Sequence, residues 1–462
     1  MVQWPAGQWA NTGKRRSAVS PIEREVSYSR GVPGSRTDGL RRGIERALPD
    51  RPFTIELWDG TRVPSTRHGP TLFVESPTGL GHIIRAPGEL GLGRAYVCGE
   101  LHTDDLDGIV ALLGRWEPPR LSPLRRLRLT ASALRAAGLR ALPPPPAAEL
   151  SPSRRRHTKR RDAVAVRHHY DVSNEFFALF LDETMTYSCA LWEEGTETLE
   201  DAQRAKLELI CRKLELEPGM RMLDIGCGWG SLAIHAAREH GASVWGITLS
   251  EPQAELAQQR ARDAGVEGLV EIRVMDYRDL REERFDAVAS IGMVEHVGVA
   301  QIDAYAERIA QVLEPGGRVL NHGITHVPFE AGGAHISGDF SNRYVFPDGE
   351  LLNVWRMAQA FERAGFEILN VENLHTDYAE TLRHWTVRFD EHLEEAQALA
   401  GTERMRVWRL YLRAARNAFE TAQNAVCQVL CSAPLVEGPS PSPTGRRHEP
   451  ARRRVPPVRV PA

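Results

Sequence analysis

A run of glycines after a strand-like stretch constrains the fold of this chain more than any other feature. The residues LDIGCGWG occupy 223–230, and the next ten, SLAIHAAREH, have the apolar period of a helix. In an α/β sheet such a turn lies at the carboxyl edge of the strands, where ligands bind. Gly226, Gly228 and Gly230 let the backbone turn tightly and approach a ligand without a clash from a β-carbon. The sequence therefore predicts a ligand site at this turn.

Helix-like and strand-like stretches alternate from Lys206 to about residue 323. The strand-like stretches are RMLDIG, SVWGITL, VEIRVM, FDAVASIG and GRVLNHG. This alternation predicts an α/β fold, a doubly wound parallel sheet with helices on both faces. No Walker lysine follows the glycine turn, which argues against a phosphate-binding loop. The second strand ends in Thr-Leu-Ser at 248–250, without the acid that an NAD-binding Rossmann domain carries about 20 residues after its glycines.

The rest of the chain differs from this region in composition. The β-like runs FTIELWDG, TLFVES and GHIIRA precede the helix-like DDLDGIVALLGRW. Both ends are rich in Pro and Arg and have no apolar period. We predict five segments: a disordered tail at 1–40, a small α+β lipid-binding-like domain at 41–142, a Pro/Arg-rich linker at 143–164, a catalytic domain at 165–434, and a disordered tail at 435–462.

The composition limits the location and the partners of the protein. The net charge is −3, and 26% charged residues are ordinary for a soluble protein. The six cysteines form no Cys-x-x-Cys pair and no zinc spacing, so we expect reduced thiols in the cytoplasm and no bound metal. No stretch approaches the roughly 18 consecutive apolar residues of a membrane span. The start of the chain has no apolar signal-peptide core. We expect the protein to meet a membrane only peripherally, at its inner face.

Basic residues are concentrated in two segments. Residues 121–142 have the pattern of a basic amphipathic helix, and 151–161 contain six Lys or Arg and no acid. The second segment is either a solvated linker or a patch that holds the protein against anionic lipid headgroups. No aromatic interleaving and no reading motif accompany it, so we expect no nucleic-acid partner. The apolar side of 173–181, SNEFFALFL, is either a core helix or a further surface that contacts lipid.

The Gly-x-Gly-x-Gly spacing of the turn resembles the first motif of the class I SAM-dependent methyltransferases. The resemblance implies S-adenosyl-L-methionine (SAM) as the co-substrate, with the glycines along its methionine half. Many of these enzymes end the second strand with an acid for the ribose hydroxyls, and here hydroxyl groups and an amide must replace it. The residues predicted to bind the cofactor are Tyr187, Ser188, Asp224, Gly226, Gly228, Gly230, Thr248, Leu249, Ser250, Gln253, Asp276 and Tyr277.

Five further segments follow one another in an unbroken order. They are HHYDVSNEFFALFLDETMTYSCALW (168–192), SIGMVEHVG (290–298), NHGITH (321–326), RYVFPDGEL (343–351) and DYAETLRHW (377–385). Together with the glycine turn, they resemble the cyclopropane-fatty-acyl-phospholipid and mycolic acid synthase family from about residue 165 to about 430. A weaker match over 45–115 is similar to the small lipid-binding N-terminal domain of the bacterial phospholipid enzymes.

The resemblance implies a chemistry and a set of catalytic residues. An alkene is a poor nucleophile, so the sulfonium must be held at near-attack distance from it. Methyl transfer leaves a carbocation, and in this family a bound bicarbonate takes the proton that must then leave. Carried over residue by residue, the groups that hold the bicarbonate are Cys189, Glu295, His322, Ile324 and Tyr378. Ala415 stands where some members have a cysteine, which argues against a covalent cysteine mechanism.

These residues also have structural interpretations. Cys189 could be a small buried apolar residue, and Tyr378 could cap its helix. Glu295 and His322 lie where the strands of such a sheet deliver residues to the ligand crevice, which favours a functional role. We predict that His296, beside Glu295, points elsewhere and is structural.

The leading hypothesis is transfer of a methylene group from SAM to a cis double bond of a phospholipid acyl chain at the membrane surface, which gives a cyclopropane. The same first step can instead end in a methylene-branched chain, which a reductase would then act on. Retention of Glu-His-Val-Gly at 295–298 favours ring closure. Two other classes are a small-molecule O- or N-methyltransferase and a lipid-binding protein with an inactive catalytic domain. The sequence leaves open the double-bond position, the headgroup and the formation of a homodimer.

Overall fold

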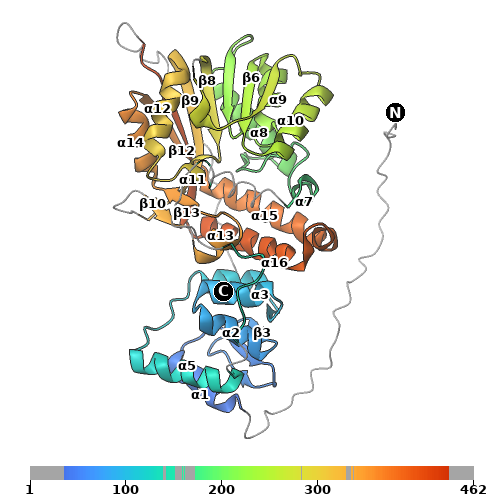
Figure 1. The fold of residues 1–462 in the computed structure, drawn as a ribbon, viewed down its shortest axis with the longest axis vertical. Helices are drawn as coiled ribbons and strands as arrows, with labels where there is room; N and C mark the ends of the chain where they lie inside the picture. The colour runs from blue at the N-terminus through green and yellow to red at the C-terminus, as the bar shows by residue number, and fades with distance from the viewer. Residues whose placement is uncertain are drawn as a thin grey trace, which may run out of the picture.

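The computed structural model describes residues 36–138, 142–150, 159, 161, 172–281, 283–328, 334–336 and 338–435. Nearly all of the two predicted tails, and most of the basic segment 151–161, lie outside these residues. Figure 1 shows the described chain as two stacked parts, with the N-terminal helices at one end and a large sheet at the other.

The large sheet has nine strands, and five neighbouring strands, which reach one edge at β7, are parallel. In spatial order these five are β7 (Val270–Val274), β6 (Ser243–Thr248), β5 (Arg221–Ile225), β8 (Phe285–Ile291) and β9 (Leu313–His326). The antiparallel strand β13 (Asn424–Ser432) pairs with β9 on one side and with β12 (Glu367–Asn373) on the other. The last strand is therefore paired along both of its edges. Two short strands, β10 (Ala334–Ile336) and β11 (Glu350–Leu352), extend the sheet beside the end of β9.

Helices cover both faces of this sheet, which confirms the predicted α/β fold (Figure 1). One face buries apolar side chains of α8 (Leu199–Lys213), α9 (Ser231–His240) and α10 (Glu251–Asp263). The other face buries those of α11 (Val294–Val297), α12 (Ile302–Val312), α14 (Val354–Arg363) and the 3-10 turn η2 (Tyr277–Asp279). Local signals set the helix starts, since the Thr198 side chain caps α8 and the Ser250 side chain caps α10.

A helical layer packs at the carboxyl end of the sheet around an aromatic core. It consists of α7 (Asn174–Ala178), α13 (Asp339–Tyr344), α15 (His375–Glu391) and α16 (Leu393–Glu420). Phe176, Phe177 and Phe180 are each 0% exposed, and their rings lie against that of Trp408. The hypothesis that SNEFFALFL contacts a membrane is therefore wrong, because its three phenylalanines and Leu181 are buried inside the protein.

The N-terminal part has a sheet and a core of its own. Its four strands stand in the order β2 (Arg62–Val63), β1 (Thr54–Leu57), β3 (Thr71–Val74), β4 (Leu101–Thr103). Its helices are α1 (Asp38–Ala47), α2 (Pro77–Arg85), α3 (Glu89–Val97), α4 (Leu106–Leu113) and α5 (Pro123–Ala137). The expectation of a β-like run at GHIIRA is wrong, because these residues belong to α2. The Ser76 side chain caps that helix, and Pro77 fits its first turn.

The two parts meet through α3 and α4, which pack against α16. Arg94 of α3 donates two hydrogen bonds of 2.6 Å to the buried carboxylate of Glu149, which also accepts from Arg343 and Tyr344. Gly93 lies so close to the Phe340 ring that a β-carbon there would come within 2.3 Å of it. Within the described residues, no helix is both long and apolar enough to cross a membrane.

Candidate active site

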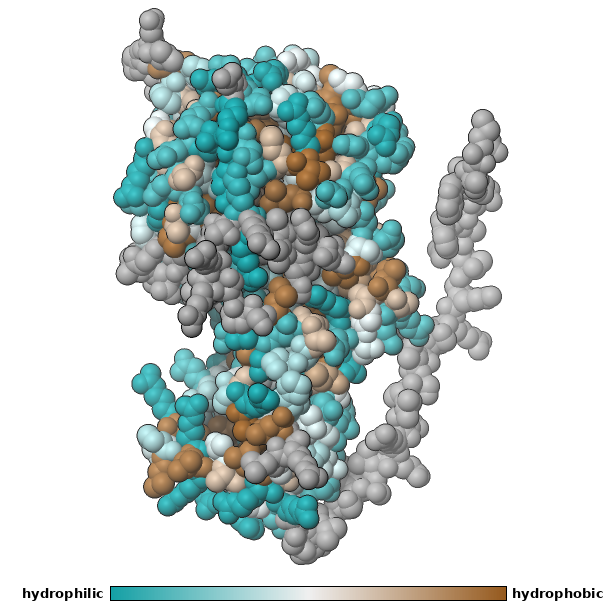
Figure 2. All heavy atoms as spheres, in the orientation of Figure 1, coloured by the Kyte–Doolittle hydropathy of each residue, from teal (hydrophilic) through white to brown (hydrophobic). Residues whose placement is uncertain are grey.

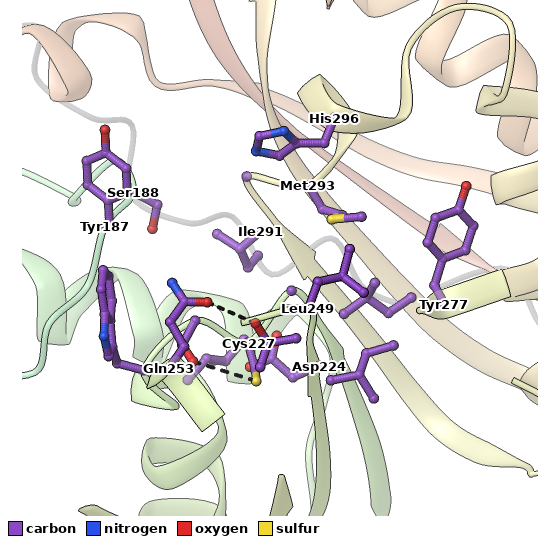
Figure 3. A pocket seen from close by; sticks show the side chains of 18 of the residues that line it. Tyr187, Ser188, Asp224, Cys227, Leu249, Gln253, Tyr277, Ile291, Met293 and His296 are labelled. Carbon is purple, nitrogen blue, oxygen red and sulfur yellow. Dashed lines mark hydrogen bonds between the residues drawn. The ribbon is translucent and has the colours of Figure 1, made fainter. Parts of the chain in front are cut away.

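A cavity of about 120 Å³ lies at the carboxyl ends of β5, β6 and β8 (Figure 3). It is called the cofactor cavity below. Ten of the twelve residues predicted to bind SAM line it, namely Tyr187, Ser188, Asp224, Gly226, Gly228, Thr248, Leu249, Gln253, Asp276 and Tyr277. The structure places the other two, Gly230 and Ser250, outside the lining. Each has a structural task there, since Gly230 begins α9 close to Ala257 and Ser250 caps α10.

The glycine turn adopts a backbone that other residues rarely adopt. Gly226 and Gly228 have φ angles of 77° and 54°. A β-carbon at Gly228 would meet no protein atom within 4 Å, so its backbone faces open space. This leaves room for a ligand to lie directly against the turn.

The end of β6 brings together the hydroxyl of Thr248 and the amide of Gln253, the groups expected to replace the missing acid. The Thr248 hydroxyl donates to Gln253 Oε1 at 2.9 Å, which fixes the orientation of the amide. Gln253 Nε2 is buried and has no hydrogen-bond partner among the described residues. A buried donor without a partner is costly unless a ligand satisfies it. The amide therefore suits ribose hydroxyl oxygens as acceptors.

Two buried charged groups lie at the other side of the cofactor cavity. Asp224 is 2% exposed, and its Oδ2 has no partner among the described residues. Burial raises the pKa of this carboxyl to about 7, although the nearby Lys206 opposes the shift. Burial lowers the pKa of Lys206 to about 8, and its Nζ donates to Ser188 Oγ at 2.9 Å. The unsatisfied carboxylate oxygen suits a cationic amino group, such as that of the methionine half of SAM. Sequence reasoning missed Lys206, because a lysine within a helical run carries no motif.

A second, larger cavity of about 740 Å³ lies between the two parts of the protein. It is called the acyl cavity below, after the substrate that the sequence predicts. α3, α4 and β4 line one side, and β9, α15 and α16 line the other. The predicted catalytic residues Cys189, Glu295, His322, Ile324 and Tyr378 all line it. Four residues line both cavities: Tyr187, Ser188, Gly292 and His296. The two cavities thus meet beside the predicted catalytic residues.

Glu295 lies on α11, directly after β8. Its Oε1 accepts a hydrogen bond of 2.6 Å from the backbone N–H of Ile324. Its Oε2 is buried without a partner among the described residues. Burial raises the pKa of this carboxyl to about 7, against the effect of the hydrogen bond. A carboxylate held in this way is a ready acceptor for a proton or an O–H group in the acyl cavity.

His322 on β9 faces the acyl cavity with a defined tautomer. Lys213 Nζ, which can only donate, lies 2.7 Å from Gln428 Oε1, so the amide nitrogen of Gln428 lies toward the ring. That nitrogen is 3.3 Å from His322 Nδ1, which must accept, and the ring proton is therefore on Nε2. Burial lowers the pKa of His322 to about 3 and keeps the ring neutral. Nε2 has no partner among the described residues, so it offers one donor to the cavity.

The remaining predicted catalytic residues surround the same region. The Cys189 thiol donates to the carbonyl oxygens of Ala190 at 3.1 Å and Leu374 at 3.7 Å, so its sulfur is engaged with the protein. The Ile324 N–H is taken up by Glu295, which makes Ile324 a residue that positions this carboxylate. The Tyr378 ring packs between those of Trp385 and Phe419 and is 9% exposed.

The structure differs from the sequence interpretation at His296. We predicted that this residue points elsewhere, but it lines both cavities (Figure 3). The prediction is wrong because both cavities reach α11, so that Glu295 lines one of them and His296 lines both. Ala415 on α16 does line the acyl cavity, so no thiol is offered at that position.

One cluster of metal-binding residue types lies elsewhere. The Sγ of Cys211 and the ring nitrogens of His235 and His240 lie within 4.8 Å of one another. Both rings are already held by Glu208 Oε2, at 3.3 and 3.0 Å. None of these residues lines either cavity, so the cluster takes no part in the site.

The sequence also matches known proteins. The sequence profile described as mycolic acid cyclopropane synthetase matches residues 157–429. A probable fatty acid methyltransferase of Mycobacterium tuberculosis is 40% identical over 82% of this chain and 90% of its own length. This chain belongs to the mycolic acid cyclopropane synthetase family. The cyclopropane-fatty-acyl-phospholipid synthase of Escherichia coli is 36% identical over 79% of this chain and 88% of its own length.

A solved structure of the family also matches. The mycolic acid cyclopropane synthase CmaA1, complexed with SAH and CTAB, superimposes with a TM-score of 0.55 at 31% identity. The match covers 58% of this chain and 98% of that one. This chain is therefore a SAM-dependent methyltransferase of this family. Residues 36–138, which form the N-terminal part, precede the segment that the family profile matches.

Proposed function

We propose that this enzyme transfers a methylene group from SAM to a cis double bond in a phospholipid-bound unsaturated acyl chain and forms a cyclopropane. The observation that carries the proposal is the junction of the two cavities at Tyr187, Ser188, Gly292 and His296. The smaller cavity, proposed to hold the methyl donor, meets there a larger and more apolar one. An alkyl chain fits the second cavity far better than a small polar acceptor does.

The residues at this junction suit a bound bicarbonate ion, which has one O–H donor and further acceptor oxygens. Glu295 Oε2 is an acceptor without a partner, and His322 Nε2 is a donor without a partner, among the described residues. SAM would supply the electrophilic methyl group, and bicarbonate would supply the base for the proton that leaves. Glu295 and His322 would orient this base, with Cys189 and Tyr378 as further contacts. The apolar walls exclude water, which would otherwise trap a carbocation on the chain.

The two cavities draw their residues from different parts of the chain, and this difference suggests where the domains begin and end. We take 41–142 as the domain that supplies one wall of the acyl cavity, 143–164 as the linker, and 165–434 as the catalytic domain. The separate sheet and core of the N-terminal part support this division. Since the acyl chains lie in a bilayer, we place the enzyme peripherally at the inner membrane face.

Product analysis tests the proposal. The purified enzyme is incubated with SAM, bicarbonate and vesicles of oleoyl phospholipid, and the fatty acid methyl esters are analysed by mass spectrometry and proton NMR. The proposal expects a gain of one CH₂ with upfield ring protons. The same mass with vinylidene protons would identify a methylene-branched product, which needs a reductase partner. No mass change in the lipid, with SAM still bound, would contradict the acyl-chain assignment.

A further inference from the structure

The outward face of α5 is unusually apolar for a solvated helix. Leu124 and Leu127 are 56% and 65% exposed, and no other described large hydrophobic residue is as exposed. The opposite face packs on α1 and α2 and buries Ala133 and Ala136. Leu124 precedes Ala133, and Leu127 precedes Ala136, by nine residues, or about two and a half helical turns. The two leucines therefore point directly away from the protein core.

Arginines surround these leucines. Residues 115–148 contain one acid, Glu117, and seven arginines, at positions 115, 120, 125, 126, 128, 135 and 140. Arg125, Arg126 and Arg128 are exposed, and within the described residues no carboxylate pairs with them. Figure 2 shows strongly hydrophobic and strongly hydrophilic residues side by side at this end of the molecule. Guanidinium groups bind phosphate oxygens in a bidentate manner. The surface thus combines two exposed leucines with groups that can bind phosphate.

This helix is connected closely to the acyl cavity. Trp116 and Pro118 line that cavity, and Leu124 follows Pro118 by six residues. Six residues span at most about 20 Å, so Leu124 lies within that distance of the cavity wall. A surface that binds a bilayer at this place would hold the lipid close to the site that its acyl chain must enter.

We propose that the N-terminal half of α5 is the docking site for an anionic phospholipid bilayer. Leu124 and Leu127 insert among the acyl chains, while Arg125, Arg126 and Arg128 bind lipid phosphates. The proposal rests on the proposed function, since it supplies the route by which a membrane acyl chain reaches the acyl cavity. It also assigns the membrane contact to α5 instead of 173–181, whose phenylalanines are buried.

The leucines are tested by co-sedimentation of the full-length enzyme with vesicles of oleoyl phosphatidylglycerol, without SAM. We expect Leu124→Ser/Leu127→Ser to weaken vesicle binding at least tenfold. Val387→Ser/Leu399→Ser is the matched control, because these residues are 48% and 45% exposed on α15 and α16. The control should bind like the wild type. Equal binding by both double variants would overturn the proposal.

The arginines are tested with the same vesicles and with vesicles of phosphatidylcholine. Arg125→Gln/Arg126→Gln/Arg128→Gln should weaken binding to the anionic vesicles at least tenfold and should flatten its salt dependence. Arg204→Gln/Arg238→Gln/Arg262→Gln changes the net charge equally on the catalytic domain and should have little effect. If both triple variants lost vesicle binding equally, net charge alone would explain the loss, and the assignment to α5 would be overturned.

Two further measurements separate this proposal from others. If the leucine variant changes the sedimentation coefficient of the free enzyme instead of vesicle binding, the surface binds a second copy of the chain and the proposal is overturned. Vesicle binding is measured without turnover, so it does not depend on the chemistry. Failure of the wild type to alter the acyl chains would contradict the proposed function, while the loss of binding in the α5 variants would still support docking.

Discussion

The cofactor cavity and the acyl cavity touch each other but are built in different ways. The residues of the cofactor cavity all come from one stretch of the chain, between Met185 and Gln301, and most follow the ends of parallel strands. The acyl cavity draws its residues from Leu72 to Val426 and depends on the packing of α3 and α4 against α16. In the proposed function, the methyl donor would thus be held mainly at one sheet, and the acceptor at the junction of two parts. The two binding functions should therefore respond to mutation separately.

The strongest test of this separation is Glu295→Gln, at the catalytic end of the acyl cavity. The glutamine side chain keeps the shape of Glu295, and its oxygen can still accept the hydrogen bond from the Ile324 N–H. The substitution removes the negative charge of Glu295, which the proposed function requires for the bound base. We expect the turnover number to fall by about 10²–10⁴-fold, with SAM affinity unchanged in calorimetry. A comparable loss of SAM affinity would show that the two cavities are not independent.

A smaller loss is expected for Gln428→Glu, which does not touch either cavity. Lys213 can still bind one carboxylate oxygen, but the other oxygen must now accept a proton from His322 Nδ1, which reverses the tautomer. We expect activity to fall about 10–100-fold, as for other changes behind a functional histidine. Nitrogen-15 NMR of labelled histidine should show the proton on Nδ1. Gln258→Glu, on α10 outside both cavities, is the control and should leave the tautomer unchanged.

Val110→Phe on α4 tests whether the N-terminal part shapes the acceptor site. The larger ring would occupy the acyl cavity that Val110 lines. We expect kcat/KM for long acyl chains to fall about five- to tenfold more than for short ones, which corresponds to about 1–1.4 kcal/mol. Val387→Phe, on an exposed position of α15, should have no such effect. An unchanged chain-length profile in Val110→Phe would separate the N-terminal part from substrate binding.

Thr248→Val is the corresponding test on the cofactor side. It removes the hydrogen bond that orients Gln253. Since one such bond contributes about 1 kcal/mol, we expect the Kd for SAM to rise about fivefold, without a change in chain-length preference. Thr386→Val removes a similar buried bond within α15 and should leave SAM binding unchanged. A shift of chain preference in Thr248→Val would contradict the separation.

The smallest effect concerns stability. Burial raises the pKa of Glu295 to about 7, well above its value of 4.5 in the unfolded chain, so the folded state keeps a proton that the unfolded state loses between these pH values. The contribution of this group to folding therefore becomes less favourable as pH rises through this window. At pH 8 we expect the ligand-free Glu295→Gln variant to have a higher Tm than the wild type, since each kcal/mol of added stability raises Tm by about 2–4 °C. At pH 4 the two proteins should have nearly the same Tm. A wild type that is more stable at both pH values would show that Glu295 has a partner in the free enzyme.

The cofactor cavity could be largely predicted from sequence because its parts are local. The glycine turn, the end of β6 and the following helix caps each lie within a few residues, and the strand-to-helix alternation orders them in one sheet. Gly230 and Ser250 were placed with the ligand-binding residues although they serve the helix starts. Motif spacing alone does not separate a residue that shapes a turn from one that faces the ligand.

The acyl cavity could not be predicted in the same way. Residues such as Tyr96, Val110 and Trp116 carry no motif, and only the packing of α3 and α4 on the catalytic part brings them into one cavity with Tyr378. The role of Gln428 also depends on the pairing of β13 with β9, which brings it beside His322, 106 positions earlier in the chain. GHIIRA was mistaken for a strand because its short apolar run fits both structures, and only the cap at Ser76 decides for a helix.

The most direct test of the account follows the transferred carbon itself. The enzyme is given SAM with a trideuterated methyl group, bicarbonate and oleoyl phospholipid vesicles, and the product is analysed by mass spectrometry and NMR. The account predicts that the acyl chain gains a CD₂ group within a cyclopropane ring, because one deuteron leaves from the transferred carbon, and that Glu295→Gln abolishes this gain. An intact CD₃ group on an oxygen or nitrogen atom would contradict it.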